Sequence, residues 1–450
     1  MKSQVLKIHL VSLGCARTLV DSEVALGGLQ KEGYEIAANL ESADVAIVNT
    51  CGFIEEAKRE SIDVILDLCD LKKKGGLKAV VVLGCLAQRY SEELKKELPE
   101  VDGIVGTNNY GDLAEVLKPL KEKKQRVIRV NAKPHYLLDE NSPRIVLTPH
   151  HLAYVKISEG CINACSYCAI PKMKGPHRSR SIESILSEIR NLSRDRKLSE
   201  INLIGQDTAA FGFDQTREFK LPELLRRIDE LDLVPWVRLL YAHPGHVSEE
   251  LIDALAECRS VCKYVDFPIE HSHDAMLKRM NRGVTREKME WGIRMLRKKI
   301  SGVSIRTTVI VGFPGETEEE FDDLMEFLKN TRFDRLGVFM FSKEDGTRAY
   351  DLPNQIAPNV KQRRFNAVMV QQKEISREIN ESFVGKTVKV MIDEKSPQED
   401  AMLYYGRTQA DAPDVDNQVM VRSEKTLAAG EFVNVKIEDA LEYDLVGDAV

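Results

Sequence analysis

The stretch LAYVKISEGCINACSYC, residues 152–168, carries the strongest signal in the chain. Its first part, LAYVKIS, is mostly apolar and predicts a strand, and Cys161, Cys165 and Cys168 follow on the loop that leaves this strand. Soft thiolate ligands select iron–sulfur clusters, zinc or copper(I). The stretch therefore predicts a metal centre at the end of a strand.

The number of cysteines in this loop distinguishes between the metals. A structural zinc site needs a fourth ligand close by, and His177 is the nearest candidate. A four-iron, four-sulfur cluster on three thiolates keeps one iron without a protein ligand, which leaves a place for a substrate or cofactor to bind. The spacing favours this cluster over structural zinc.

The region from 151 to about 380 repeats a strand and a helix-length segment. Such a run of units predicts a partial or complete barrel, in which active sites lie at the carboxyl ends of the strands. The cysteine loop follows the first of these strands. The six strand candidates are LAYVKIS (152–158), EINLIGQD (200–207), WVRLLYAHP (236–244), YVDFPIE (264–270), SIRTTVIVGFP (304–314) and RLGVFMFS (335–342).

The first 120 residues also alternate strand and helix patterns, which predicts a small doubly wound α/β domain. Cys15, Cys51 and Cys85 each stand at the carboxyl end of a predicted parallel strand. Because these ends share the ligand-binding edge of an open sheet, we expect the three cysteines to converge. The alternative is that each is an ordinary buried hydrophobic residue.

The composition of the chain changes at two further places. Residues 121–150 mix charge with Pro and Asn and read as a linker, whereas the tail from 383 has short alternating strands with turns, typical of a small antiparallel β-barrel. The predicted fold class is therefore α/β with a β-barrel at the end. Its parts are an N-terminal doubly wound domain (1–120), a linker (121–150), a barrel domain (151–382) and a C-terminal β-barrel (383–450).

Charge is concentrated in the tail. The last 68 residues carry 7 Lys and Arg against 14 Asp and Glu, which accounts for the whole net charge of −7. No signal peptide is recognisable, and no apolar run reaches the ~18 residues that a membrane span needs. We therefore expect a cytoplasmic protein that does not enter membranes, in which thiols stay reduced and clustered cysteines bind metal or take part in catalysis.

With Tyr167 before its last cysteine, the C-x3-C-x2-C loop is similar to the signature of radical S-adenosylmethionine enzymes. Other stretches resemble the methylthiotransferases within that group, and the resemblance extends over essentially the whole chain. The motifs VDSE, CGF and GRTQADAPDVDN are closer to the RimO type, which acts on a ribosomal protein, than to the MiaB type, which acts on tRNA. The stretches that carry it are VSLGCARTLVDSE, NTCGFIEEAKRES, GCLAQRY, KISEGCINACSYCAIPKMKGPHRSRS and VGFPGETEEEF.

This resemblance implies a three-cysteine N-terminal domain, a radical S-adenosylmethionine partial (β/α)6 barrel and a C-terminal TRAM domain. It also implies two 4Fe–4S clusters, one on each cysteine triad, with S-adenosylmethionine bound and cleaved at the second, and an electron donor protein. The implied product carries a methylthio group on the β-carbon of an aspartate in small-subunit ribosomal protein twelve. The alternative product is a methylthiolated adenosine of tRNA.

Further residues are candidates for binding. Tyr167, Gly205, Gln206 and Gly312 are expected near the cofactor, although the glycines also fit plain turns. The acidic tail is expected to attract a basic ribosomal protein and to repel nucleic acid, which is not expected as the substrate. The predicted docking residues are Asp411, Asp414 and Asp416.

Several features have simpler interpretations. Cys69, Cys258 and Cys262 are expected to be packing residues. His271 and His273 either line the cavity or make only local hydrogen bonds, and we favour the second. The basic run KMKGPHRSRS (172–181) indicates either a site for an acidic group or a solvated loop. Glu270 stands where the family has Gln. A function of another class, a non-catalytic module stabilised by zinc or a cluster, remains an alternative.

Overall fold

The computed structural model describes residues 5–121, 126–134, 136–397 and 402–450. The chain divides into two compact units. The first contains Met1–Leu147, Ser158–Arg180 and Ser342–Tyr350, and the second contains Thr148–Ile157, Ser181–Phe341 and Asp351–Val450. The expected linker 121–150 thus mostly belongs to the first unit, although residues 122–125 and 135 lie outside the described residues.

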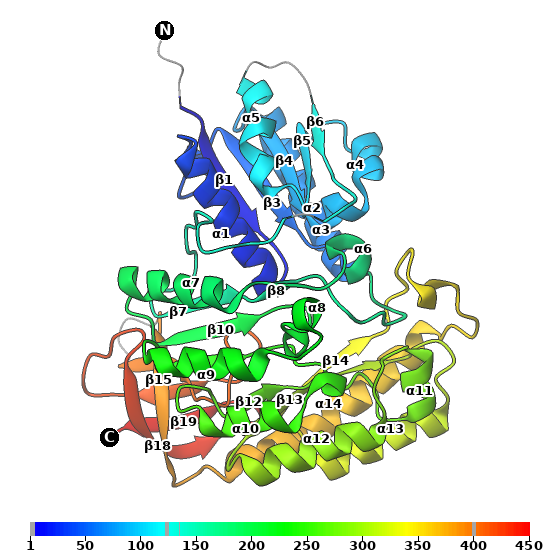
Figure 1. Cartoon of the computed structure of the whole chain (residues 1–450), viewed down its shortest axis with the longest axis vertical. Helices are drawn as coiled ribbons and strands as arrows, with labels where there is room; N and C mark the ends of the chain where they lie inside the picture. The colour runs from blue at the N-terminus through cyan, green and yellow to red at the C-terminus, as the bar shows by residue number, and fades with distance from the viewer. Residues whose placement is uncertain (1–4, 122–125, 135, 398–401) are drawn as a thin grey trace. The chain divides into compact units, whose positions relative to one another are not determined.

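The N-terminal part of the first unit is a parallel sheet with strand order β2-β1-β3-β4-β5-β6, so the expected doubly wound domain is confirmed (Figure 1). The run AVVVLG of β4 is buried throughout, as expected of a strand covered on both faces. Its strands are β1 (Lys7–Ser12), β2 (Glu35–Ile36), β3 (Val45–Thr50), β4 (Ala79–Gly84), β5 (Gly103–Gly106) and β6 (Val127–Arg129). Its helices are α1 (Ala16–Lys31), α2 (Glu55–Lys73), α3 (Cys85–Arg89), α4 (Ser91–Glu97) and α5 (Leu113–Lys121).

Helices cover both faces of this sheet. Leu29 of α1 and Leu117 of α5 belong to the hydrophobic cluster on one face. Ile65 of α2 and Leu86 of α3 belong to the cluster on the other face, where Cys69 also packs, as its sequence context predicted. Strand order reverses between β1 and β3, and ligands of open α/β sheets bind at such a switch point, beyond the carboxyl ends of the strands.

The first unit also holds the cysteine loop. Residues 158–180 form β8 (Ser158–Glu159), α6 (Ile170–Lys174) and β9 (Arg178–Ser179), with β8 and β9 paired antiparallel. The backbone N–H of Ala349 donates to the carbonyl of Ser166 at 2.8 Å, so the segment 342–350 contacts the cysteine loop directly. The sequence had placed both segments in the barrel domain; here they pack with the N-terminal domain.

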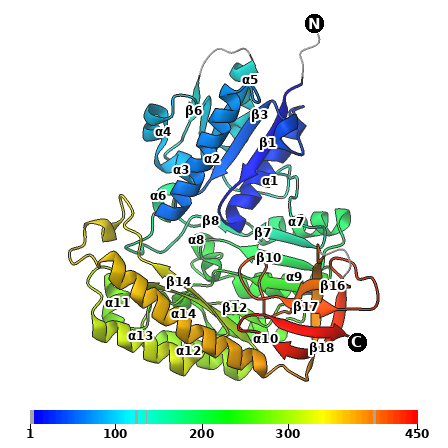
Figure 2. The same ribbon diagram turned by 180° about the vertical axis from the view of Figure 1, so that it is seen from behind.

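The second unit contains all six expected barrel strands, in two three-stranded parallel sheets (Figure 2). The Ala242 N–H donates to the Asp266 carbonyl and links the two sheets into a partial barrel. The strands are β7 (Leu152–Lys156), β10 (Glu200–Ile204), β11 (Trp236–Leu239), β12 (Tyr264–Asp266), β13 (Ser304–Val311) and β14 (Arg335–Met340). The helices are α7 (Ile182–Asp195), α8 (Phe213–Thr216), α9 (Leu221–Leu231), α10 (Glu249–Glu257), α11 (Asp274–Arg279), α12 (Arg286–Lys299), α13 (Glu318–Thr331) and α14 (Pro358–Glu381).

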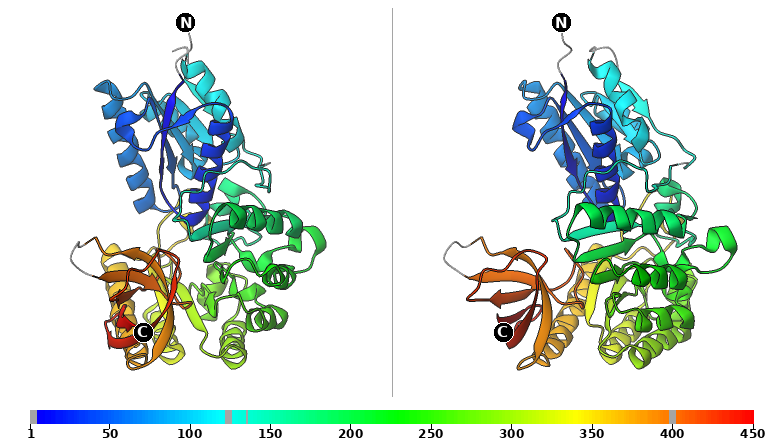
Figure 3. Two further views of the ribbon diagram at one scale, coloured as in Figure 1. Left: turned by 90° about the vertical axis from the view of Figure 1, so that its left-hand side faces the viewer. Right: turned by 60° about the vertical axis from the view of Figure 1, so that its left-hand side comes forward.

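The tail is a closed five-stranded β-barrel, drawn in orange to red in Figure 3. It is antiparallel except between β17 and β19, which pair in parallel, and β19 was not predicted. No described helix meets the length and apolarity that crossing a bilayer requires. The strands are β15 (Thr387–Lys395), β16 (Leu403–Arg407), β17 (Val419–Arg422), β18 (Phe432–Ala440) and β19 (Leu445–Ala449).

The loop between β16 and β17 packs against the amino ends of the barrel strands. Arg335, the first residue of β14, pairs with Asp411 at 2.6 Å between Nη2 and Oδ1. The Tyr264 hydroxyl, at the start of β12, donates to Asp416 at 2.7 Å. Arg306 Nε lies 3.2 Å from the same carboxylate, whose side chain is 2% exposed.

These contacts correct the predicted docking surface. The side chains of Asp411 and Asp416 are 3% and 2% exposed and form ion pairs within the chain, so the expectation that they face a partner is wrong. Asp414 is exposed and accepts a hydrogen bond from Tyr154 at 3.3 Å, and its role in docking stays a prediction. Active sites of barrels lie at the opposite, carboxyl ends of the strands.

Candidate functional site

The first cysteine triad, Cys15, Cys51 and Cys85, follows the carboxyl ends of β1, β3 and β4. The backbone places them together. A Cβ on Gly14 would lie 3.6 Å from Cys51 Sγ, and a Cβ on Gly52 would lie 2.9 Å from the carbonyl carbon of Cys85. The expected convergence at the sheet edge is therefore seen, on both sides of the switch point.

Glycine is required at one of these turns. Gly84 has φ +104, a conformation that L side chains rarely adopt, and a Cβ there would lie 2.3 Å from Asn49 Oδ1. This tight turn ends β4 and makes Cys85 the first residue of α3. Cys15 is the N-cap residue of α1, so two of the three cysteines stand at helix N-termini, where the helix dipole favours thiolates.

The three thiols differ in their electrostatic environment. Burial opposes ionisation of Cys15, but the charge and hydrogen bond of Arg17 outweigh it and lower the pKa to about 6. Arg17 Nε donates to Cys15 Sγ at 3.5 Å. Burial raises the pKa of Cys51, and it raises the pKa of Cys85 to about 12. In protein without bound metal, Cys15 is thus the cysteine of the first triad that ionises most readily.

The second triad, Cys161, Cys165 and Cys168, lies between β8 and α6 in the same compact unit. Backbone N–H groups point at its sulfurs: Asn163 donates to Cys161 Sγ and Ile170 donates to Cys168 Sγ, each at 3.4 Å. Such hydrogen bonds stabilise cluster thiolates and tune their reduction potential. This arrangement fits an iron–sulfur cluster.

The cysteine triads are not among the groups of described residues whose ligand atoms lie close enough for a single metal ion. Among the described residues, the one group of three whose possible ligand atoms all lie within 4.8 Å of one another is Asp207, His243 and His246. His177, the candidate fourth zinc ligand, instead contacts Ser179 at 3.1 Å.

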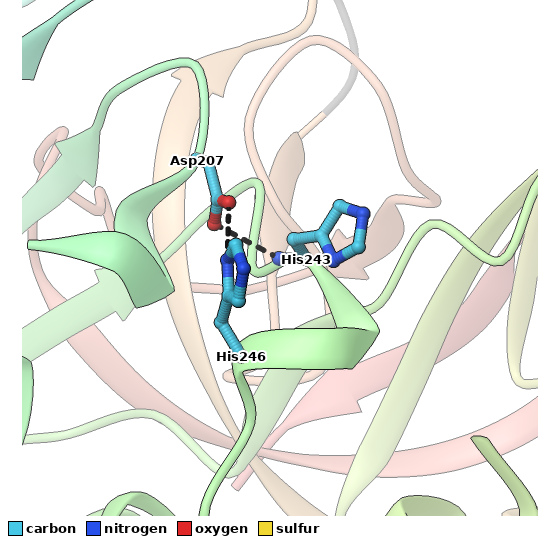
Figure 4. A group of neighbouring side chains, drawn as sticks. All are labelled: Asp207, His243 and His246. Atoms are coloured by element: carbon cyan, nitrogen blue, oxygen red, sulfur yellow. Dashed lines mark hydrogen bonds and ion pairs between the residues drawn. The ribbon is translucent and has the colours of Figure 1, made fainter. Parts of the chain in front are cut away.

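The Asp207, His243 and His246 group lies at the carboxyl ends of β10 and β11 (Figure 4). His246 Nδ1 lies 2.7 Å from Asp207 Oδ2, and the Gly245 N–H donates to His243 Nδ1 at 3.0 Å. Both Nδ1 atoms are thus engaged, and the neutral His243 ring carries its hydrogen on Nε2. Burial, with the charge of Arg282, lowers the pKa of His243 to about 3.

These hydrogen bonds argue against a metal at this group, because a neutral His243 with Nδ1 as acceptor has no free lone pair. The group was not predicted from the sequence. Its only signal was the placement of Asp207 and the YAHPGH segment after two consecutive barrel strands. The ordinary reading of such residues is turn chemistry, and only the fold brings them together.

The residues expected near the cofactor lie just after barrel strands or in the cysteine loop, and their contact with a cofactor stays a prediction. Gly205 is buried directly after β10, and Gln206 follows it. Gly312 follows β13 with φ +72, a conformation in which an L side chain is strained, and a Cβ there would lie 2.3 Å from Lys361 Cγ. Tyr167 is half-buried in the cysteine loop.

The remaining cysteines and histidines, Glu270 and the basic run are also placed by the structure. Cys258 and Cys262 are buried, as expected of packing residues. His271 Nδ1 accepts from the His273 N–H at 3.0 Å, and Glu270 lies 3.8 Å from Arg282. The basic run is not a solvated loop, because Lys174, His177 and Arg180 are all buried.

Comparison with known proteins decides the family. The chain is 47% identical over 447 residues to the ribosomal protein uS12 methylthiotransferase RimO of Clostridioides difficile. The aligned residues make up 99% of each chain. It is 46% identical to the protein of the same name from Desulforamulus reducens, over 98% of this chain and 99% of that one. The chain belongs to the RimO family. The family expected from the sequence is thereby confirmed.

Family matches along the chain agree with the RimO assignment. The radical SAM superfamily matches residues 155–328, the uncharacterized protein family UPF0004 matches 7–106 and the TRAM domain matches 384–450. As a member of the RimO family, the chain is a radical S-adenosylmethionine methylthiotransferase, whose cofactors are S-adenosylmethionine and an iron–sulfur cluster.

The fold is also found among solved structures. The radical S-adenosylmethionine methyltransferase TsrM from Kitasatospora setae, solved with cobalamin and a [4Fe-4S] cluster, superposes with a TM-score of 0.55 at 16% identity, over 89% of this chain and 81% of that one. The cobalamin-dependent radical enzyme OxsB gives a TM-score of 0.51 at 14% identity, over 83% of this chain and 56% of that one. At these identities the likeness concerns the fold alone.

Proposed function

We propose that this chain adds a methylthio group to the β-carbon of an aspartate in ribosomal protein uS12, and that it does so with two iron–sulfur clusters. The observation that carries the proposal is the near full-length identity to proteins named uS12 methylthiotransferases. The two cysteine triads, held in one compact unit, support the number of clusters. A single-cluster enzyme would have no need for three further cysteines at a sheet edge.

The two triads have different roles in this proposal. Cys161, Cys165 and Cys168 would hold the cluster that supplies an electron for reductive cleavage of S-adenosylmethionine, chemistry able to remove hydrogen from an unactivated carbon. Cys15, Cys51 and Cys85 would hold the first cluster, at which the sulfur is delivered. The N–H groups of Asn163 and Ile170 keep the sulfurs of the second triad in ligand orientation. Arg17 keeps Cys15 ionised.

Cofactor contacts are assigned to the strand ends of the barrel. Gly205 and Gln206 would meet the methionyl part of S-adenosylmethionine, and Gly312 would allow the adenine to approach the backbone. Tyr167 would lie beside the cluster within the cysteine loop. The positive φ of Gly312 and the buried position of Gly205 support close approach of a ligand to these segments.

The charge of the tail supports this substrate less than the sequence suggested. Two of the three acidic residues assigned to docking neutralise arginines inside the chain. Recognition of a basic ribosomal protein therefore depends on the remaining exposed acids, Asp414 among them. An electron donor protein is a further expected partner.

The test offers reconstituted enzyme the ribosomal protein and unmodified tRNA together, with S-adenosylmethionine and a reductant. We expect mass spectrometry to find replacement of one hydrogen by a methylthio group on a uS12 aspartate. Cys165→Ala should abolish the product, and Cys258→Ala, which alters a buried cysteine outside both triads, should not. Modification of tRNA adenosine with none on the protein would refute the proposal.

A further inference from the structure

Lys174 is a buried lysine that the proposed chemistry does not use. It is the last residue of α6, six positions after Cys168, and it is 5% exposed. Its ammonium lies 2.9 Å from Asp21 Oδ2 and 3.5 Å from Glu159 Oε2. It also lies 5.4 Å from the centre of the Tyr110 ring.

The partners of Lys174 come from both cysteine-bearing parts of the first unit. Asp21 is in α1, six residues after Cys15, and Glu159 is two residues before Cys161. Both carboxylates are buried, at 3% and 4% exposure. A buried lysine between two buried carboxylates from separate segments holds these segments together, because removing its ammonium would leave the two carboxylates to repel one another.

Neighbouring contacts fix α6 in the same way. The Thr107 hydroxyl donates to the carbonyl of Met173 at 3.0 Å, and Arg178 donates to the carbonyl of Tyr136 at 3.0 Å. The loop of the second triad is thus attached to the N-terminal domain on both sides of Lys174.

Lys174 and Asp21 belong to helices that lie at the first triad. Helix α6, which ends at Lys174, packs against α3, whose first residue is Cys85. Asp21 belongs to α1, whose N-cap residue is Cys15. The ion cluster of Lys174, Asp21 and Glu159 therefore sits where its charges influence whatever the first triad binds.

We propose that Lys174 is a positioning residue that couples the two triads: it is carried on the loop of the second triad, is held by Asp21 and Glu159, and sets the reduction potential of the cluster on Cys15, Cys51 and Cys85. This rests on the proposed function, which places a cluster there. A nearby cation stabilises the more negative, reduced form of a cluster, and a nearby anion destabilises it. Lys174 and Asp21 therefore act in opposite directions.

The experiment uses the full-length chain with Cys161, Cys165 and Cys168 all replaced by Ala, so that only the first cluster is loaded. Its midpoint potential is measured by redox titration with electron paramagnetic resonance. Lys174→Met should move the potential to more negative values, Asp21→Asn should move it to more positive values, and Lys174→Arg should restore the parent value. Lys73→Met, an exposed lysine of α2, is the matched control.

Potential shifts of opposite sign for Lys174→Met and Asp21→Asn indicate an electrostatic role. If the two variants only disturbed packing, the sign of the shift would not depend on the sign of the charge that was removed. Equal potentials in all variants, or shifts of the same sign, would overturn the inference. If Lys174→Met fails to load iron, Asp21→Asn alone decides: a positive shift supports the inference and an unchanged potential rejects it. If the parent chain binds no iron on the first triad, the proposal of a cluster there is wrong, an outcome that the iron content reports separately.

Discussion

The guanidinium of Arg17 donates a hydrogen bond through Nε to the sulfur of Cys15, two residues earlier in the chain, at 3.5 Å. The contact lies at the N-terminus of α1, where the helix dipole adds to the same effect. It makes one cysteine of the first triad chemically different from the other two. This difference is measurable in protein without metal.

We expect Cys15 to be the most reactive thiol of the first triad in metal-free protein. A thiol with a pKa of about 6 is about 90% ionised at pH 7, and the thiolate is the nucleophile. Cys85, with a pKa of about 12, stays protonated. Alkylation at pH 7 followed by peptide mass spectrometry should label Cys15 first.

Arg17→Met should slow labelling of Cys15 at pH 7 by about tenfold or more, because its pKa then rises toward the usual value. The pH at which labelling reaches half its maximum should move up from about 6. Preferential labelling of Cys85 in the parent protein would contradict the electrostatic account. Arg59→Met, an exposed arginine of α2, serves as control.

The two triads should lose their clusters independently. Cys51→Ala should remove about half of the iron of the reconstituted protein and retain reductive cleavage of S-adenosylmethionine, because the second triad is intact. Cys165→Ala should abolish cleavage. Iron content and 5′-deoxyadenosine formation are the measurements, and Cys69→Ala, which alters a packed cysteine of α2, is the control. An iron content unchanged by Cys51→Ala would exclude the first cluster.

The ion pair of Arg335 and Asp411 should matter for stability rather than for docking. Removing one partner of a buried pair costs about 3–5 kcal/mol, whereas removing an exposed charge costs little. Asp411→Asn should therefore destabilise the contact between the two barrels of the second unit, and Glu424→Gln, at an exposed position of the tail, should not.

Trp236 provides the measurement. It is one of two tryptophans and packs edge to face on Phe432 of β18, with ring centroids 4.9 Å apart. In a Trp291→Phe background, Trp236 fluorescence should report separation of the two barrels. The transition should occur at a lower urea concentration for Asp411→Asn than for Glu424→Gln. Equal transitions for the two variants would show that the ion pair is unimportant.

His243 should make the metal-free protein sensitive to acid. Its pKa is lowered to about 3 by burial, and an unfolded histidine takes up its proton near pH 6.5. Between these values the unfolded state binds more protons, so stability falls as pH decreases from about 6.5 toward 3, by at most about 1.4 kcal/mol per pH unit. In chemical denaturation experiments, the free energy of unfolding of His243→Asn should fall less steeply with decreasing pH over this range than that of the parent protein.

Most strands could be predicted because their apolar runs are local signals. The AVVVLG run of β4 and the SIRTTVIV run of β13 are examples. Convergence of Cys15, Cys51 and Cys85 could be predicted as well, since parallel strands end at one sheet edge. The strands β2 and β19 escaped prediction, because β2 has two residues and β19 contains Gly and Asp.

Ion pairs between distant segments could not be predicted. Nothing near Lys174 in the sequence reveals that its partner Asp21 lies 153 positions away, so the basic run looked like either a binding loop or a solvated one. Asp411 and Asp416 likewise read as an exposed acidic stretch, because their partners Arg335 and Arg306 belong to strands of another domain. A charge count along the chain does not distinguish internal from external counter-ions.

The internal pairing of the tail has a practical consequence for studies of substrate preference. A chain shortened to end before residue 383 would lose Asp411 and Asp416, and with them the counter-charges of Arg335 and Arg306. Arg306 would retain its pair with Asp266 at 3.3 Å, but Arg335 would lose the Asp411 carboxylate and would attract a polyanion in the assay. Binding of RNA by such a fragment would therefore be no evidence that the intact chain acts on tRNA.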